Sequence, residues 1–482
     1  MGAGFDCIGV PCVSCAFLEV HMWLAALFWS SAHAAPIASV HADHLAHPPP
    51  LPAARMARPS PPDDIAPPER IVFGYYATWA GELVDVDWAR LSHLAVFNVD
   101  MNADGTVSGM STWDALGPEA VALAAPHGVR VQLTLTCFDE DVMNAVLPDA
   151  GRRGVLVDTL VSAVNRVGAA GVSVDCEGVP GTLRDELTTL VMELQAEVDE
   201  VSIATPAIDW TDAFDKAALS MHADQIFIMG YGYHWAGGDP GPVAPLEGGA
   251  PWSVWSLSDT VATYVAEGAD PERIVLGLPL YGRTWPTTDN RVPGTATASG
   301  TPVTMVEGIA LASTHGREYD DQTETPYTFS SSTSQTWYDD HDSVQVKVHW
   351  AIEAGLGGIG FWALNYEGND PAFWSMITEE TTGLEPGDTG GATGSGSGEG
   401  GDSGGDSGGD SGGESGGGSE ADVGAGSGGG TDTGAGSRDT SAVWEPKGTR
   451  WGGQSASCAA TGWGVLLLLG PLCGWYRSRR KD

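Results

Sequence analysis

The segment from Gly171 to Glu177 carries two acidic side chains one residue apart, at the end of a run that is typical of a β-strand. Because successive side chains of a strand point to opposite faces, Ser173, Asp175 and Glu177 share one face and Cys176 points to the other. Carboxylates held about 6 to 7 Å apart along a strand repel when both are ionised, so one tends to keep its proton and can act as a general acid. The segment favours glycosidase-like chemistry, and a strand with a merely polar face is the alternative.

The elements that must position these side chains alternate between strand and helix patterns over residues 69–381. Strands are predicted at 71–76, 91–98, 129–136, 171–176, 201–205, 225–230, 274–280 and 358–363. Apolar residues at three- and four-residue spacing predict helices that include 155–167, 183–198, 257–267 and 343–354. This α/β order and size fit a (β/α)8 TIM barrel, with a doubly wound sheet as the alternative.

Residues 284–342 are too many for a plain connection between a strand and a helix. We therefore expect a small insertion after the seventh strand, placed where it could form one wall of a cleft.

The chain is strongly acidic, with a formal net charge of -41 and only 22 basic residues among 482. Such a charge disfavours polyanions, so no nucleic acid partner is expected, and a neutral or cationic ligand is favoured.

The N-terminal region resembles an export signal. An apolar run at 22–29 is followed by the A-x-A pattern at 32–34, and translation from Met22 would supply the positive amino terminus. Residues 1–34 are therefore interpreted as a signal peptide region, with a buried N-terminal helix as the alternative. Residues 35–68 are rich in proline and alanine and are predicted to be an extended linker.

Metal and disulfide chemistry receive little support. His41, His44 and His47 lie in the predicted linker with no fourth ligand nearby, so neither a metal nor an organic cofactor is expected. Cys137 and Cys176 fall at the ends of neighbouring predicted strands. A disulfide between them is one interpretation, and two buried thiols are the favoured one.

The C-terminal part changes character again. Residues 382–445 consist largely of glycine, serine and acidic residues, which predicts a disordered stalk. Residues 446–482 contain Cys458, an apolar segment and a basic end. They resemble the Cys-containing sorting tails of myxobacteria, with a plain membrane anchor as the alternative. We expect a monomer that is exported and held at the cell surface or outer envelope by this tail.

Several motifs occur in an ordered series. They are FGYYATW at 73–79, MGY at 229–231, GPVAPL at 241–246, LGLPLYGR at 276–283 and GGIGFWAL at 357–364. With the acidic segment, this series resembles glycoside hydrolase family 18, and within it the spore-cortex-lytic and chitinase-like bacterial branch. The family motif D-x-x-D-x-D-x-E maps onto Ala170, Ser173, Asp175 and Glu177, so only its last two acidic positions are kept.

The resemblance implies a retaining mechanism in which the N-acetyl oxygen of the substrate attacks the anomeric carbon. It makes Glu177 the acid and base, Asp175 the partner of the acetamide N–H, and Tyr231 a donor to the acetamide oxygen.

The resemblance also implies a set of substrate-binding residues. Trp362 would form the floor under the sugar, although a core tryptophan is the alternative. The other members of the set are Tyr75, Thr134, Ser173 and Met229. The strand-end hydroxyls among them could equally satisfy backbone groups.

Two departures bear on activity. Ser173 stands where the family usually has Asp, and Gly232 follows Tyr231 where the family often has Asp. Neither departure touches Glu177 or Asp175. The resemblance therefore still predicts a chitinase-like glycosidase for β-1,4-linked N-acetylglucosamine polymers, either chitin or peptidoglycan strands. A weak or inactive glycan-binding barrel is the alternative function.

Overall fold

A computed structural model gives the structure of residues 39–51 and 67–382, to which all structural statements refer. The predicted signal region, stalk and sorting tail lie outside the described residues. None of the helices in the described ranges is long and apolar enough to cross a membrane.

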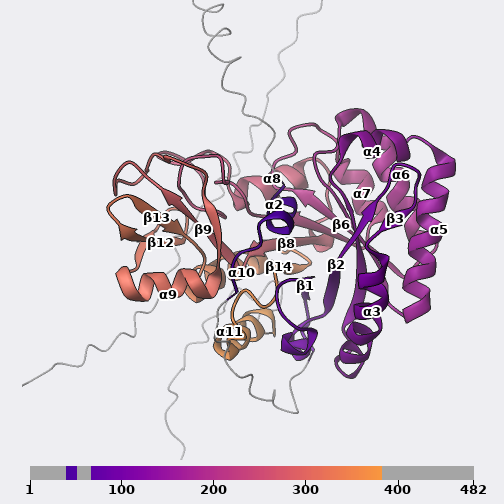
Figure 1. Cartoon of the computed structure of the whole chain (residues 1–482), viewed down its shortest axis with the longest axis horizontal. Helices are drawn as coiled ribbons and strands as arrows, with labels where there is room; N and C mark the ends of the chain where they lie inside the picture. The colour runs from indigo at the N-terminus through magenta and orange to yellow at the C-terminus, as the bar shows by residue number, and fades with distance from the viewer. Residues whose placement is uncertain (1–38, 52–66, 383–482) are drawn as a thin grey trace, which may run out of the picture. The chain divides into compact units, whose positions relative to one another are not determined.

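Eight parallel strands form a closed barrel (Figure 1). The barrel strands are β1 (Ile71–Ala77), β2 (His93–Met101), β4 (Arg130–Cys137), β5 (Gly171–Cys176), β6 (Glu200–Pro206), β7 (Gln225–Met229), β8 (Ile274–Pro279) and β14 (Gly358–Trp362). Closure follows because β1 pairs with both β2 and β14. The short β3 (Val107–Ser108) extends β2 as an antiparallel partner. The predicted (β/α)8 barrel and all eight predicted strands are confirmed.

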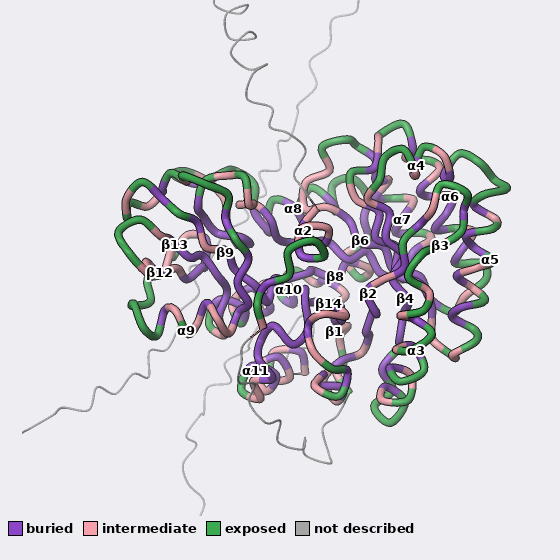
Figure 2. The backbone as a smooth tube through the Cα atoms, viewed as in Figure 1, coloured by how far each residue is buried: buried purple, intermediate pink, exposed green. Residues whose placement is uncertain are grey.

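Helices surround the barrel and expose their outer faces (Figure 2). They are α3 (Met110–Ala124), α4 (Glu140–Val146), α5 (Ala150–Val167), α6 (Arg184–Gln195), α7 (Lys216–His222), α8 (Leu257–Ala266), α10 (His341–Glu353) and α11 (Pro371–Thr382). Short 3-10 turns lie at Leu83–Asp85, Trp88–Arg90, Ala125–His127, Gly181–Leu183 and Pro271–Arg273. Asp149 begins α5 by accepting from the N–H groups of Gly151 and Arg152, which have no partner inside the helix.

The expected insertion after the seventh barrel strand forms a small second sheet, seen at the left of Figure 1. Its strands are β9 (Tyr281–Pro286), β10 (Thr301–Thr304), β11 (Glu318–Asp320), β12 (Thr325–Ser331) and β13 (Ser334–Trp337), in the antiparallel order β10-β9-β13-β12-β11. Helix α9 (Met305–His315) lies between β10 and β11 in the chain. Because β9 follows β8 almost directly, the insertion is anchored beside the barrel mouth.

The middle of the barrel is filled by Phe227 of β7, which is fully buried. A Cβ at Gly277 of β8 or at Gly360 of β14 would lie 2.4 Å or 2.3 Å from this ring. These two strands therefore need glycine at these positions, because barrel interiors are packed cores with no room for both side chains.

The opposite end of the barrel from the acidic pair holds a buried polar network around Glu200, which begins β6. Its carboxylate accepts from His93 (2.9 Å), Gln132 (3.0 Å) and Gln225 (2.9 Å). Arg130 adds an ion pair at 3.0 Å. Burial by itself raises the pKa of Glu200, but the hydrogen bonds and the charge of His93 outweigh it and lower the pKa to about 2.

Two expectations from the sequence are wrong. Cys137 and Cys176 form a disulfide rather than two thiols. The two residues are register partners at the ends of the adjacent strands β4 and β5, which brings their side chains within bonding reach.

The predicted extended linker, 35–68, contains the helix α2 (Val40–Ala46). Ser39 begins this helix, because its hydroxyl accepts from the N–H of Ala42 at 2.8 Å. The three prolines that follow His47 cannot continue it.

Replacing Glu200 with alanine should lower the free energy of unfolding by about 3 kcal/mol, because it leaves His93 and Arg130 without their buried carboxylate. The stability difference between the wild type and the variant should have its full size above pH 4.5, where the unfolded side chain is ionised. It should shrink as the pH falls towards 2, the pKa in the folded state. Urea unfolding at several pH values measures it. The exposed Glu197 offers a matched control, and equal effects of Glu197→Ala and Glu200→Ala would contradict the assignment.

Candidate active site

The acidic pair lies at the C-terminal end of the barrel, where enzymes of this fold carry out their chemistry. Asp175 is fully buried, and Glu177 follows β5 directly. The N–H of Glu177 donates to the carbonyl of Cys137 at 3.1 Å, so the chain beyond β5 stays fixed to β4. A carboxyl oxygen of Asp175 and one of Glu177 lie within 4.8 Å of each other, which places the two carboxyl groups in one site.

Tyr231 and Trp362 join this site from other strands. Tyr231 follows Met229, the last residue of β7, and Trp362 is the last residue of β14. The side chains of Met229, Tyr231 and Trp362 are buried, with exposed fractions of 5% or less. The Trp362 indole N–H donates to His44, and its ring stacks on His41, so its contacts include residues at the barrel mouth.

The supporting hydroxyls lie one layer deeper. The hydroxyl groups of Tyr75 and Ser173 are hydrogen-bonded at 2.8 Å. Thr134 is the register partner of Ser173 on β4. The Thr134 hydroxyl and one oxygen of Asp175 have no hydrogen-bond partner within the described parts of the chain. Thr134 and Ser173 therefore lie beneath the acidic pair rather than at the surface of the cleft.

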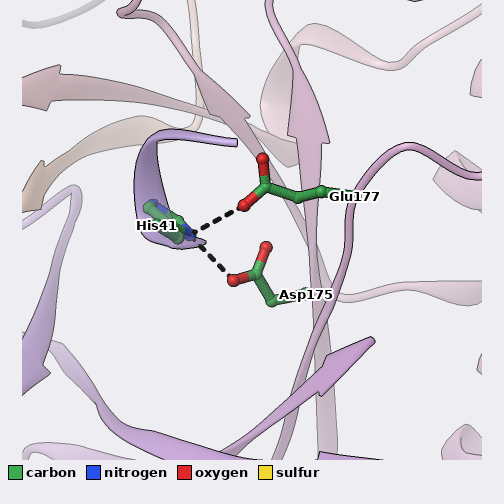
Figure 3. Close-up of side chains that lie close together, drawn as sticks. All are labelled: His41, Asp175 and Glu177. Atoms are coloured by element: carbon green, nitrogen blue, oxygen red, sulfur yellow. Dashed lines mark hydrogen bonds and ion pairs between the residues drawn. The ribbon is translucent and has the colours of Figure 1, made fainter. Parts of the chain in front are cut away.

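His41 of α2 occupies the centre of the site, and the sequence did not identify it (Figure 3). Its Nδ1 lies 2.8 Å from Oδ2 of Asp175 and 3.6 Å from Oε1 of Glu177. Its Nε2 lies 2.7 Å from the hydroxyl of Tyr231. The ring stacks on Trp362 with 3.8 Å between centroids. One imidazole thus touches the four residues to which the sequence assigned the chemistry.

Neighbours of His41 hold α2 in place. The Ser39 hydroxyl donates to Oε1 of Glu177 at 2.5 Å, and the Trp362 indole donates to Nδ1 of His44 at 3.0 Å. Asp43 pairs with Arg283 of β9 at 2.8 Å. The histidines at 41 and 44 gave a signal only as a cluster in a proline-rich segment, and that pattern does not reveal what they contact.

The electrostatics favour a protonated Glu177. Burial and the nearby Asp175 charge raise its pKa to about 7, although His41 and Ser39 act in the opposite direction. Burial and the charges of Arg283 and His41 place the pKa of His44 well below its ordinary value, so His44 is neutral and accepts from Trp362. Burial also raises the pKa of Tyr231 well above its ordinary value, which keeps its hydroxyl as a donor.

His41 itself is subject to opposing effects. Burial lowers its pKa, but the charge and hydrogen bond of Asp175, together with the charge of Glu177, raise it above the ordinary value. Within the described ranges, a ring nitrogen of His41 and carboxyl oxygens of Asp175 and Glu177 lie close enough together to act as metal ligands. Both ring nitrogens of His41 have hydrogen-bond partners, Asp175 and the Tyr231 hydroxyl.

An open cleft continues from Glu177 past Tyr231 to Trp210, and residues 39 and 40 form part of its wall. Trp210 is 56% exposed and packs edge-on against Trp255, which is 38% exposed. Large aromatic faces exposed along a cleft are suited to stacking on sugar rings. The sequence analysis did not select either tryptophan, because both lie in connections outside the motifs.

A closed parallel barrel with two carboxylates, a tyrosine and a tryptophan at its C-terminal end is a typical glycosidase architecture. The description "Glycosyl hydrolases family 18" belongs to the family model that matches residues 71–367, more than half of the chain. The chain therefore belongs to glycosyl hydrolases family 18, which makes it a glycoside hydrolase by family.

Individual relatives agree with this assignment. YdhD of Bacillus subtilis is 26% identical over 300 residues, covering 59% of this chain and 68% of that protein. A cortical fragment-lytic enzyme of Bacillus anthracis is 22% identical over 316 residues, covering 61% and 68%. Among solved structures, a chitinase from Cycas revoluta in complex with (GlcNAc)3 has a TM-score of 0.59 at 19% identity, covering 64% of this chain and 99% of that one, and shares the fold.

The raised pKa of Glu177 predicts the alkaline limb of activity. A general acid works in its protonated form, so kcat/KM should fall as the pH rises through about 7. The infrared spectrum of the wild type should show a protonated carboxyl band that Glu177→Gln lacks, and this band should disappear as the pH rises through about 7. A constant kcat/KM up to pH 9 would contradict this role of Glu177.

Proposed function

We propose that the chain hydrolyses β-1,4-linked N-acetylglucosamine polymers with retention, using the acetamido group of the substrate as the nucleophile. The observation that supports this proposal best is the placement of Asp175 and Tyr231. Both contact the imidazole ring of His41, which stacks on Trp362, and each contacts a different ring nitrogen. A group with one donor and one acceptor, such as an acetamide, fits between them.

The proposed reaction has two steps. In the first, the acetamide oxygen bonds to the anomeric carbon while Glu177 gives its proton to the departing glycosidic oxygen. Asp175 accepts from the acetamide N–H and stabilises the positive charge, and the Tyr231 hydroxyl donates to the acetamide oxygen. In the second, the Glu177 carboxylate takes a proton from water, whose oxygen bonds to the anomeric carbon as the acetamide oxygen leaves.

The substrate class is proposed from the site together with the relatives. A cortical fragment-lytic enzyme and a chitinase that binds (GlcNAc)3 both belong among the similar proteins. Chitin-like chains and peptidoglycan strands share the N-acetylglucosamine unit that the mechanism needs, and both are retained as candidates. The negative charge of the chain is compatible with either, because neither is a strong polyanion.

Ser173 favours a second candidate function, a glycan-binding barrel with little turnover. Because it is a serine, this position carries no charge beside Asp175, and its hydroxyl is hydrogen-bonded to that of Tyr75. In the family a carboxylate usually stands here, and a neighbouring carboxylate helps its partner to share a proton. Retention of both Asp175 and Glu177 favours the enzyme.

Glu177→Gln should abolish cleavage of N-acetylglucosamine oligomers while oligomer binding stays within a few fold, because the amide keeps the shape and loses the proton. Release of reducing ends and calorimetric titration measure the two quantities. Glu119→Gln, on the exposed face of α3, is the matched control. Cleavage of plain glucose oligomers at an equal rate would exclude the acetamide mechanism, and binding without cleavage by the wild type would favour the second candidate.

We also propose that the protein is exported and held at the cell surface by residues 446–482, a membrane-associated tail for which Cys458, the apolar segment and the basic end are the support. Deleting 446–482 should release active enzyme into the medium with unchanged kinetics on soluble oligomers. Immunoblots of cells and medium measure the distribution. A deletion inside 385–445 is the control and should leave the protein with the cells. A truncated protein that stays cell-bound would overturn the proposal.

A further inference from the structure

We propose that residues 39–46, the cleft segment, occupy the sugar-binding subsite over Trp362 and block it, with the His41 ring in the place of the acetamido group. This inference rests on the proposed function, because it takes Asp175 and Tyr231 as the partners of the acetamide. It makes the resting enzyme a closed form in which substrate competes with a segment of the same chain.

The hydrogen-bond pattern of His41 matches that of an acetamide. In the neutral form whose proton is on Nδ1, the ring donates to Asp175 over 2.8 Å and accepts from the Tyr231 hydroxyl over 2.7 Å. An acetamide offers the same pair, an N–H donor and a carbonyl acceptor, to the same two residues. The ring cannot be present together with a bound acetamido sugar, because both need these two partners.

The remaining contacts reproduce further parts of a bound sugar. The ring stacks on Trp362 at 3.8 Å between centroids and an angle of 28°, as a pyranose face would. The Ser39 hydroxyl lies 2.5 Å from Oε1 of Glu177, where a glycosidic oxygen would receive its proton. The cleft segment therefore covers the catalytic acid as well as the floor.

The cleft segment is held by buried polar contacts that a passing linker would not have. His41 and His44 are both fully buried, and burial of such groups is unfavourable unless they are hydrogen-bonded. His44 accepts from Trp362 and packs edge-on against Tyr281 with 4.5 Å between centroids. Asp43 pairs with Arg283, whose side chain is only 3% exposed.

Gly232 provides the space that the segment needs. A Cβ at this position would lie 3.0 Å from Cγ2 of Val40, tighter than most real contacts, and the backbone there has a positive φ of 80°. The residue at which the chain departs from the family's frequent Asp is thus the residue against which α2 packs. A side chain at 232 would push against the segment.

A competing segment has a defined kinetic signature. If the open form is only a fraction of the population, the apparent KM rises by the inverse of that fraction and kcat is unchanged. Because the segment belongs to the same chain, it rebinds after each release without dilution.

The test compares two histidine variants of the full chain. His41→Ala should lower the KM for soluble N-acetylglucosamine oligomers about tenfold or more at unchanged kcat, since the open fraction rises. His47→Ala is the matched control, because its side chain is 77% exposed and its ion pair with Asp43, at 3.4 Å, involves no group of the barrel mouth. Asp43→Asn, which removes the charge pair with Arg283, should lower KM in the same direction.

A readout without turnover separates this inference from the proposed function. In Glu177→Gln, amide hydrogen exchange at 40–46 should be protected and should accelerate when tri-N-acetylchitotriose is added. The oligomer should also bind about tenfold tighter when His41→Ala is combined with Glu177→Gln. If no variant cleaves or binds the oligomers, the proposed function fails. If all cleave with the KM of the wild type and 40–46 exchange freely, the proposed function stands and the blocking role is wrong.

Discussion

The buried carboxylate of Asp175 is the constraint on which the mouth of the barrel depends. A fully buried carboxylate needs a hydrogen-bond donor, and among the described residues only one of its oxygens has a partner, His41. Asp175 lies near the end of β5, where it is the register partner of Thr136 on β4. In this structure the partner comes from α2, and under the proposed function a substrate amide would take its place.

The rest of the fold serves to hold that position. Phe227, with Gly277 and Gly360 beside it, fills the barrel beneath the site, and the Glu200 network closes its other end. The disulfide between Cys137 and Cys176 joins the strand ends next to Glu177, so the acid and its neighbour Asp175 keep their relative placement. Rigid placement matters because a general acid acts only within hydrogen-bond reach of the oxygen that it protonates.

Much of the fold was predictable because each barrel strand is a short apolar run between helical patterns. Strand β5 was predicted with its observed ends, and the others to within a few residues. Asp175, Glu177, Tyr231 and Trp362 were predictable through motifs at strand ends, where the chain order alone brings them to one face of the barrel. The disulfide was misjudged, because spacing along the chain does not reveal whether two strand-end thiols face each other.

His41 was not predictable for a different physical reason. Its role arises from contacts with Asp175, Tyr231 and Trp362, each more than a hundred residues away. No motif in the neighbouring residues 35–47 indicates these partners. A helix of seven residues is too short to be stable alone in water, so α2 depends on the cleft for its structure as the cleft depends on it for a partner to Asp175.

The two departures from the family motif gain meaning once α2 is in place. Ser173 removes a carboxylate beneath Asp175, which leaves the charge of the site to Asp175 and Glu177, the two groups that His41 faces. Gly232 removes the side chain that would meet Val40. Both changes leave Asp175, Glu177, Tyr231 and Trp362 untouched, and the change at 232 makes room for a segment over them. The residues that we propose to bind an acetamido sugar thus also bind one histidine of the same chain, because a neutral imidazole and an acetamide both offer one donor and one acceptor.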